Sequence, residues 1–383
     1  MITVQTALDR LDEYRPDWGF ATKPLHLANQ HILSEDIIAP RNQPAHSVSV
    51  MDGYAMRKSD ADREMRIVGE SRAGAPFAGE IKSGEAIRIF TGAIIPEGAD
   101  HIEIQEYAVV KNETLNFPKK SIDRDYIRYS GSDFQKGDVL FPKNTMMTPA
   151  VIMALATANI SHVSVHRKPT IALLRGGDEL KPVGDLLDDK TIIDSIGPAL
   201  IALLKQWDFP VIDLGIVADD PDDIKDRIKN CSADIIVPIG GASVGEYDYM
   251  KGAFSALGFD PIFEKVAVKP GKPSWFSKSG DKLVLGLPGN PSSAWVCAHL
   301  FLAHLIGREL SWKTLKLSSS LPKNGARDSF LRAKINQDGT VTALPSQDSG
   351  LILPLSIADA LIWRNASSDE VPENSEQTCL VLE

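Results

Sequence analysis

Two glycine-containing loops carry the residues best suited to chemistry. One lies in VAVKPGKPSWF (266–276) and holds Lys269 and Lys272, three residues apart in a Pro-Gly frame. The other lies in LVLGLPGNPSSAW (283–295), where Asn290 is the predicted N-cap of a helix. Because free N–H groups at a helix start attract anions, the two loops together predict an anion site. A pair of solvated lysines on a surface turn is the simpler alternative.

Three further loops follow apolar runs that read as strands, and they bring carboxylates, glycines and a serine. These residues are Asp178, Glu179, Asp219, Asp220, Gly240, Gly241, Ser243, Gly245, Glu246 and Asp248. Carboxylates beside phosphate-type anions predict a bridging Mg²⁺, and the metal ligands we expect are Glu179, Asp219 and Asp248. Asp220 and Asp248 each precede a predicted helix, so the simpler alternative for each is that it caps this helix and has no role in binding. Glu179 precedes no helix, which makes it the strongest candidate for a functional carboxylate.

A doubly wound α/β domain is needed to bring these loops together, and the apolar runs before the KPGKP and LPGNPSS loops are expected to be two of its parallel strands. Residues 169–312 alternate between predicted strands and helices, and the continuous apolar runs favour a parallel sheet covered on both faces. Ligands bind such sheets at the carboxyl ends of the strands. Short glycine-punctuated strands predict an inserted β domain at 46–135, and residues 313–383 read as a C-terminal β-barrel-like domain. Residues 1–45 and 136–168 are expected to form a mixed helical and strand domain, with a helix whose predicted N-cap is Thr148, before Pro149.

Composition limits the class of protein. The 383 residues include 41 basic and 51 acidic side chains, a net charge of −10 that argues against nucleic-acid binding. No segment has the length and apolar character expected of a membrane span, and the N-terminus does not resemble a signal peptide. The three cysteines, Cys231, Cys297 and Cys379, have no CxxC spacing. We therefore expect a cytoplasmic protein without a disulfide framework.

Six motifs occur in the order and spacing typical of one family. They are MDGYAMR (51–57), IRIFTGAIIPEGAD (87–100), GGDEL (176–180), GGASVGEYDY (240–249), VKPGKP (268–273) and GLPGNPSSA (286–294). Over nearly its whole length the chain resembles the molybdopterin molybdenumtransferase family, which is similar to the E domain of plant and animal homologues. The resemblance implies a four-domain subunit that forms a homodimer, with the MDGYA segment of one subunit completing the site of the other.

The resemblance also implies the reaction and its residues. Members of the family use Mg²⁺ to insert molybdate into adenylyl-molybdopterin and release AMP. Expected partners besides these substrates are a pterin-adenylylating protein and molybdoenzyme chaperones. The implied catalytic residues are Glu179, Asp52 and Asp133. The substrate-binding set is Thr91, Gly240, Gly241, Ser243, Gly245, Asp248, Pro288, Gly289 and Asn290. The molybdate-binding set is Lys269, Lys272, Ser293, Arg332 and Ser349, whose cations and hydroxyls suit a tetrahedral dianion.

Several positions depart from the family pattern. Polar residues of that pattern are replaced at Ser47, Val48, Ser132, Gly176 and Ile196, and Arg175 stands where a hydroxyl residue is usual. Two function classes therefore stay open: the enzyme, and a non-catalytic or repurposed paralogue that binds a pterin or nucleotide or acts as an assembly partner. A pyrophosphatase sharing only the α/β domain is disfavoured, because the flanking domains match as well.

Overall fold

The computed structural model describes residues 1–121, 124–240 and 249–382, and the chain divides into two compact units. One unit joins Met1–Trp18 to Lys168–Glu383, and the other is Gly19–Arg167. Within the described ranges, no helix combines the length and apolar character that crossing a bilayer requires. The boundaries of the four expected domains stay a prediction.

The first unit is built on a six-stranded sheet. Its strands, in spatial order, are β16 (Val211–Val217), β13 (Ile171–Gly176), β17 (Ile235–Ile239), β21 (Lys282–Gly286), β20 (Trp275–Ser279) and β18 (Asp260–Phe263). The first four run parallel, while β20 and β18 run antiparallel to their neighbours. Every residue of β13 and β17 is buried, as expected for strands covered on both faces.

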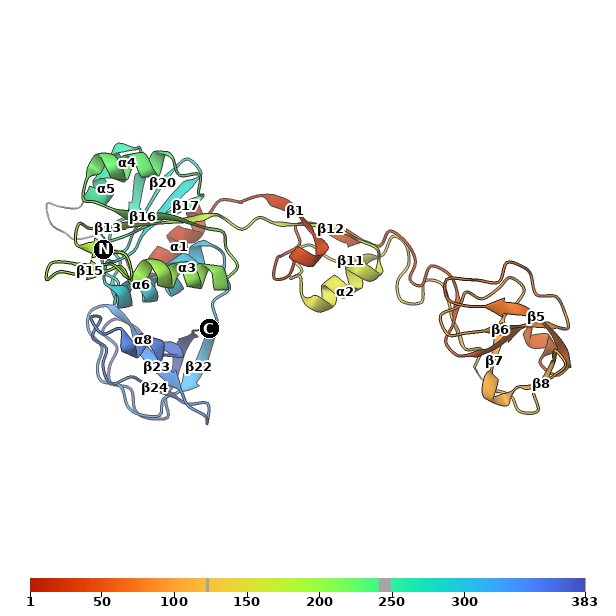
Figure 1. Cartoon of the computed structure of the whole chain (residues 1–383). Coiled ribbons are helices and arrows are strands. Elements are labelled where there is room, and N and C mark those ends of the chain that lie inside the picture. The colour runs from red at the N-terminus through yellow and green to blue at the C-terminus, as the bar shows by residue number, and fades with distance from the viewer. Residues whose placement is uncertain (122–123, 241–248, 383) are drawn as a thin grey trace. The chain divides into compact units, whose positions relative to one another are not determined.

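Helices cover both faces of this sheet (Figure 1). Ile171 and Leu173 of β13 face a core built with α1 (Val4–Tyr14), α3 (Ile196–Gln206) and the helix that begins at α6 (Pro291–Cys297) and continues through η4 (Ala298–Leu302) and α7 (Ala303–Leu305). Ala172 and Leu174 face the opposite core, with α4 (Pro221–Lys229) and α5 (Tyr249–Ala256). A short parallel ladder joins β14 (Leu180–Lys181) to β15 (Ile192–Ile193). The predicted doubly wound α/β domain is confirmed.

One expectation about this sheet is wrong. The strand before the KPGKP loop was expected to be a further parallel strand of the α/β sheet. It is instead β19 (Val268–Lys269), which pairs with a strand of the C-terminal domain. The strand that precedes β21 in the sheet is β20, which forms an antiparallel hairpin with it. A short apolar run such as VAV buries equally well in either sheet, so its pattern does not reveal its partner.

The C-terminal sheet has five strands besides β19. They are β23 (Asp328–Ile335), β25 (Ala360–Arg364), β26 (Glu376–Val381), β22 (Trp312–Lys316) and β24 (Val341–Ala343). All their pairings with one another are antiparallel, and Phe330 and Trp363 stack at 5.6 Å between ring centroids. The short helix α8 (Leu353–Ser356) precedes β25. The expected C-terminal β domain is confirmed.

The Gly19–Arg167 unit contains a six-stranded sheet of its own. Its spatial order is β7 (His101–Ile104), β4 (Gly53–Met56), β6 (Glu85–Ile89), β5 (Met65–Ser71), β9 (Thr114–Asn116) and β8 (Val109–Lys111). The MDGYA motif enters this sheet as β4, between β6 and β7. The single turns η2 (Lys58–Asp60) and η3 (Gln105–Tyr107) follow β4 and β7.

Three two-stranded ladders complete this unit. They pair β1 (Phe20–Pro24) with β12 (His162–His166), β2 (Ile37–Ile38) with β11 (Val139–Phe141), and β3 (Val48–Ser49) with β10 (Ile127–Arg128). A small apolar core lies among η1 (Leu25–Leu27), α2 (Pro149–Thr157) and the first two of these ladders. Helix α2 begins as the sequence predicts, with the Thr148 hydroxyl accepting from the Val151 N–H and Pro149 in the first turn.

Candidate functional site

A cavity of about 470 Å³ opens at the carboxyl ends of the parallel strands. We call it the strand-end cavity. It is lined by Arg175, Gly176, Glu179, Leu180, Ile192, Ile193, Asp194, Ser195, Ile196, Ile239, Gly240, Pro273, Pro288, Gly289, Asn290, Pro291 and Ser293. Among the residues predicted from the sequence, it brings Glu179, Gly240 and the Pro288–Asn290 loop together. Its volume falls in the range of small-molecule sites, and its position follows the rule for open α/β sheets.

Glycines let the loops around this cavity approach closely. Gly240 has φ +84°, and a Cβ there would lie 2.7 Å from the Gly176 carbonyl oxygen. A Cβ on Gly289 would come within 3.1 Å of the Gly240 Cα atom. Gly177 has φ +145°, and a Cβ there would lie 2.7 Å from the Glu179 Oε2 atom. Side chains at these positions would therefore separate the loops and displace the Glu179 carboxylate.

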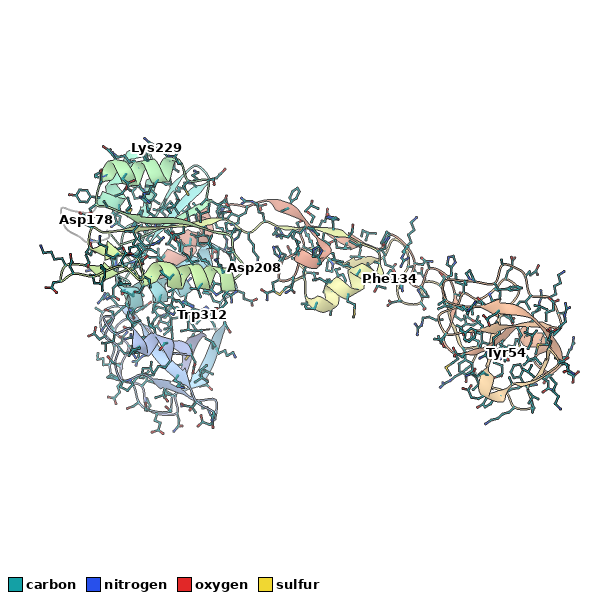
Figure 2. All side chains as sticks on the ribbon, viewed as in Figure 1. Tyr54, Phe134, Asp178, Asp208, Lys229 and Trp312 are labelled. Atoms are coloured by element: carbon teal, nitrogen blue, oxygen red, sulfur yellow. The ribbon has the colours of Figure 1, made fainter. Side chains whose placement is uncertain are left out.

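Three carboxylates gather where β13 and β16 end. Asp178, labelled in Figure 2, accepts a hydrogen bond from the Asp219 N–H at 3.0 Å. Burial, followed by the charges of Asp178 and Glu179, raises the pKa of Asp219. No group of three or more His, Cys, Asp or Glu residues in the described ranges is arranged to hold a metal ion. Mg²⁺ commonly uses one or two carboxylates together with phosphate oxygens and water, and Glu179 and Asp219 fit that requirement.

A second cavity, of about 600 Å³, lies beside the KPGKP loop. We call it the lysine cavity. Its lining is Lys269, Pro270, Gly271, Lys272, Pro273, Ser293, Arg327, Gln347, Asp348 and Ser349. Four of the five residues predicted to bind molybdate, namely Lys269, Lys272, Ser293 and Ser349, therefore line one cavity. Three cations against one carboxylate leave this cavity with a net positive charge.

Close packing against α6 fixes the shape of the KPGKP loop. Gly271 has φ +121°, and a Cβ there would lie only 2.2 Å from the Cys297 Sγ atom. The Ser274 hydroxyl donates to the Gly271 carbonyl at 2.9 Å. At the start of α6, Asn290 accepts from the Ser293 N–H at 3.3 Å, which confirms the predicted cap. The loop thus packs against the end of α6, while the start of the helix is fixed by its own cap.

The two cavities adjoin. Pro273 and Ser293 line both of them, and the Ser293 side chain belongs to the first turn of α6. A ligand in the strand-end cavity and an anion in the lysine cavity would therefore meet at Ser293. This arrangement suits a reaction that joins an organic substrate to an oxyanion.

Arg332 takes a different place from the other predicted molybdate ligands. It is 2% exposed and is not among the residues that line the lysine cavity. Its guanidinium donates to one hydroxyl and three carbonyl oxygens, those of Ser292, Ser346, Asp348 and Leu351. These bonds hold the loop that carries Ser349. In this geometry Arg332 positions Ser349, and its own contact with molybdate stays a prediction.

Sequence reasoning missed Arg327. This residue lines the lysine cavity, and its Nη1 donates to the Val268 carbonyl at 3.2 Å. The contact depends on the parallel pairing of β19 with β23, which begins at Asp328. No local signal near residue 327 indicates a pairing with a strand some sixty residues earlier. A positive residue next to a predicted strand start was the only available hint.

The remaining predicted residues of the described ranges lie in the Gly19–Arg167 unit. Asp52 Oδ1 accepts from the Thr91 N–H at 2.8 Å and from the Thr91 hydroxyl at 2.9 Å. These bonds, followed by the charge of Arg88, lower the pKa of Asp52, which keeps it ionised at neutral pH. Asp133 has an exposed side chain, and its N–H donates to the Gln43 carbonyl. Four further candidates, Gly241, Ser243, Gly245 and Asp248, lie outside the described residues.

Comparisons with known proteins agree with this architecture. Three family models match in order: "MoeA N-terminal region (domain I and II)" over residues 2–159, "Probable molybdopterin binding domain" over 173–308, and "MoeA C-terminal region (domain IV)" over 314–380. A molybdopterin molybdenumtransferase of Haemophilus influenzae is 36% identical over 82% of this chain and 80% of its own length. One of Bacillus subtilis is 32% identical over 90% and 85%.

A solved structure shows the same fold. The molybdopterin biosynthesis MoeA protein from Pyrococcus horikosii matches with a TM-score of 0.87 at 25% identity, covering 100% of this chain and 99% of that one. The architecture is thus that of a multidomain enzyme of molybdenum cofactor biosynthesis. The chain belongs to the molybdopterin molybdenumtransferase family. This membership confirms the predicted family and enzyme class, and it does not favour the non-catalytic alternative.

Proposed function

We propose that the chain catalyses the Mg²⁺-dependent insertion of molybdate into adenylyl-molybdopterin, with release of AMP. The observation that carries this proposal is the adjoining pair of cavities, one shaped for a small organic ligand and the other cationic. The names of the relatives supply the substrate class, since they are molybdopterin molybdenumtransferases.

The lysine cavity is the proposed molybdate site. Lys269 and Lys272 neutralise the dianion, and the Ser293 and Ser349 hydroxyls donate to its oxygens. Arg327 adds a third positive charge at the same cavity. Because the lysines are exposed, molybdate enters from solvent and its binding weakens as ionic strength rises.

The strand-end cavity is the proposed site for the pterin and its phosphates. Gly240 and Gly289 allow the ligand to approach the backbone, and Asn290 fixes the α6 start beside it. Glu179 and Asp219 would hold Mg²⁺, which would stabilise the charge that develops as the phosphoanhydride breaks. The raised pKa of Asp219 supports this assignment, because a cation would relieve the repulsion among the carboxylates.

We further propose that the working form is a cytoplasmic homodimer. Asp52 and Thr91 of one subunit would then serve the cavities of the other, with Asp133 as a further carboxylate. Asp52 is already ionised and oriented by Thr91, which suits a carboxylate that positions a substrate or a hydrated cation. A pterin-adenylylating protein would supply the substrate, and molybdoenzyme chaperones would receive the product.

The test is AMP release from adenylyl-molybdopterin in the presence of molybdate and Mg²⁺. The wild-type chain is expected to release AMP, and Glu179→Gln to slow release by roughly 10²–10³, the usual effect of losing one charge-stabilising group. Glu264→Gln, at an exposed glutamate outside both cavities, is the matched control and should keep full activity. Near wild-type turnover by Glu179→Gln would remove Glu179 from the mechanism.

A further inference from the structure

Arg175 is a buried cation at the wall of the strand-end cavity. Side chains of a strand alternate between faces, so Arg175 extends from the same face of β13 as Ile171 and Leu173. Those two residues pack in the apolar core against α3, and Arg175 lies one step beyond that core, where the strand ends. Its side chain is 7% exposed, and it contributes to the lining of the cavity.

Hydrogen bonds hold the Arg175 guanidinium in place but do not use all of its N–H donors. Nε donates to Asp194 Oδ2 at 2.9 Å, and Nη1 donates to Asp213 Oδ1 and to the Leu173 carbonyl. Within the described ranges, Nη2 makes no hydrogen bond to the protein. Gly197 leaves room for the group, because a Cβ there would lie 2.7 Å from Arg175 Nε. A fixed guanidinium with two unused N–H donors remains for a ligand.

Asp194 is the acceptor beside this donor. It is 5% exposed, it lines the strand-end cavity, and its Oδ1 accepts from the Gly197 N–H at 2.9 Å near the start of α3. A carboxylate offers about four acceptor positions, and the bonds from Arg175 and Gly197 use two of them. The cavity lining also includes the neighbouring Ser195 and five apolar side chains, those of Leu180, Ile192, Ile193, Ile196 and Ile239.

A buried carboxylate next to a buried guanidinium, between apolar walls, complements one particular chemical edge. A planar 2-amino-4-oxo pyrimidinone ring offers adjacent N–H donors followed by a carbonyl acceptor. We propose that Arg175 and Asp194 recognise this edge of the pterin, with Asp194 accepting from the ring N–H and the 2-amino group and Arg175 Nη2 donating to the 4-oxo oxygen. This inference rests on the proposed function and assigns the end of the substrate that the two residues select.

The assignment also orients the substrate. With the pyrimidinone edge held at Arg175 and Asp194, the opposite end of the pterin is left for the part of the cavity that contains Ser293. That serine also lines the lysine cavity. The side chain of the pterin, which carries the sulfur atoms, then faces the oxyanion.

The test compares two fluorescent probes, pterin-6-carboxylate and lumazine-6-carboxylate, which differ in having a 2-amino or a 2-oxo group. Wild-type protein is expected to bind the pterin probe on the order of 10-fold or more tightly, the scale of a paired donor–acceptor contact. Asp194→Asn keeps an oxygen for the Gly197 N–H and replaces an acceptor with a donor, so the preference should vanish or reverse. Equal wild-type affinities, no binding of the pterin probe, or an unchanged preference in Asp194→Asn would overturn the proposal.

Two further variants separate ligand contact from folding. Arg175→Lys keeps the charge but loses Nη2, so both probes, which share the 4-oxo group, should weaken by similar factors. Asp213→Asn removes the other carboxylate on Arg175, yet Asp213 does not line this cavity, so the preference should persist. Unchanged affinity in Arg175→Lys, or a lost preference in Asp213→Asn, would contradict the assignment.

Failure of this recognition can be distinguished from failure of the proposed function. If the wild-type chain releases AMP from adenylyl-molybdopterin but binds the two probes equally, only the recognition of the pyrimidinone edge fails. If it prefers the pterin probe but releases no AMP, the recognition stands and the proposed reaction fails.

Discussion

Lys269 and Lys272 present exposed ammonium groups to one cavity, and their separate contributions can be measured. Replacing either by alanine should weaken molybdate binding by about 1.5 kcal/mol, the lower end of the range for a charged hydrogen bond, since solvent screens both groups. Calorimetric titration at two salt concentrations should show a smaller difference at the higher one. Lys265→Ala is the control, because Lys265 does not line the cavity. Unchanged affinity in both Lys269→Ala and Lys272→Ala would mean that these two lysines belong to a solvated turn.

Asp219 should make stability depend on pH and on Mg²⁺. The pKa of Asp219 is raised in the folded protein. The folded protein therefore loses stability as pH rises from the pKa of the unfolded state through the pKa of the folded state, because Asp219 then ionises. Asp219→Asn should therefore melt at a higher temperature than wild type at pH 7 without Mg²⁺, and the difference should vanish below about pH 3.9, the ordinary aspartate value.

Mg²⁺ should then stabilise the wild type more than Asp219→Asn, because the cation would bind the carboxylate that the variant lacks. Thermal denaturation with and without Mg²⁺ measures both effects. If Asp219→Asn is less stable than wild type at pH 7 without Mg²⁺, then repulsion by neighbouring carboxylates does not destabilise the ionised Asp219.

At this scale the sequence predicted residue types better than residue positions. Lys269, Lys272, Ser293 and Ser349 line one cavity as expected, because motif spacing identifies loops that share a function. Arg332 is instead directed at loop carbonyls. Where a long side chain points depends on the loop packed against it, which spacing alone does not specify.

At the scale of elements, local signals were reliable and long-range pairing was not. Asn290 and Thr148 cap helices as predicted, because capping depends on residues within one turn. The same holds for Asp220, whose carboxylate accepts from the Asp222 N–H at the start of α4. The predicted sheet for β19 was wrong. Its partner β23 lies far along the chain, and no short turn connects the two strands.

The packing of the KPGKP loop on α6 yields a prediction of its own. Gly271→Ala should destabilise the protein by about 2 kcal/mol or more, since the new Cβ would overlap Cys297 and the residue has positive φ. Gly280→Ala is the matched control, with φ +56° and open space around it, and should cost about 1 kcal/mol. Urea denaturation compares them, and equal effects would show that the loop is not pressed against the helix.

At the scale of the whole molecule, the proposed site draws on residues from both units. Asp52 and Thr91 belong to Gly19–Arg167, whereas both cavities belong to the other unit. A homodimer with composite sites predicts complementation. Co-expressed Asp52→Ala and Glu179→Gln subunits should recover roughly a quarter of wild-type activity, because half of the dimers would be mixed and each would hold one intact site. Inactive mixtures, or a monomer by light scattering at micromolar concentration, would contradict this arrangement.

Two adjoining cavities are proposed to serve one reaction. The most direct measurement follows AMP and pterin-bound molybdenum together when the purified chain is given adenylyl-molybdopterin, molybdate and Mg²⁺. We expect both products to appear in equal amounts, and Lys269→Ala and Lys272→Ala to raise the molybdate concentration needed for incorporation. AMP released without incorporation of molybdenum, or neither product formed, would contradict this proposal.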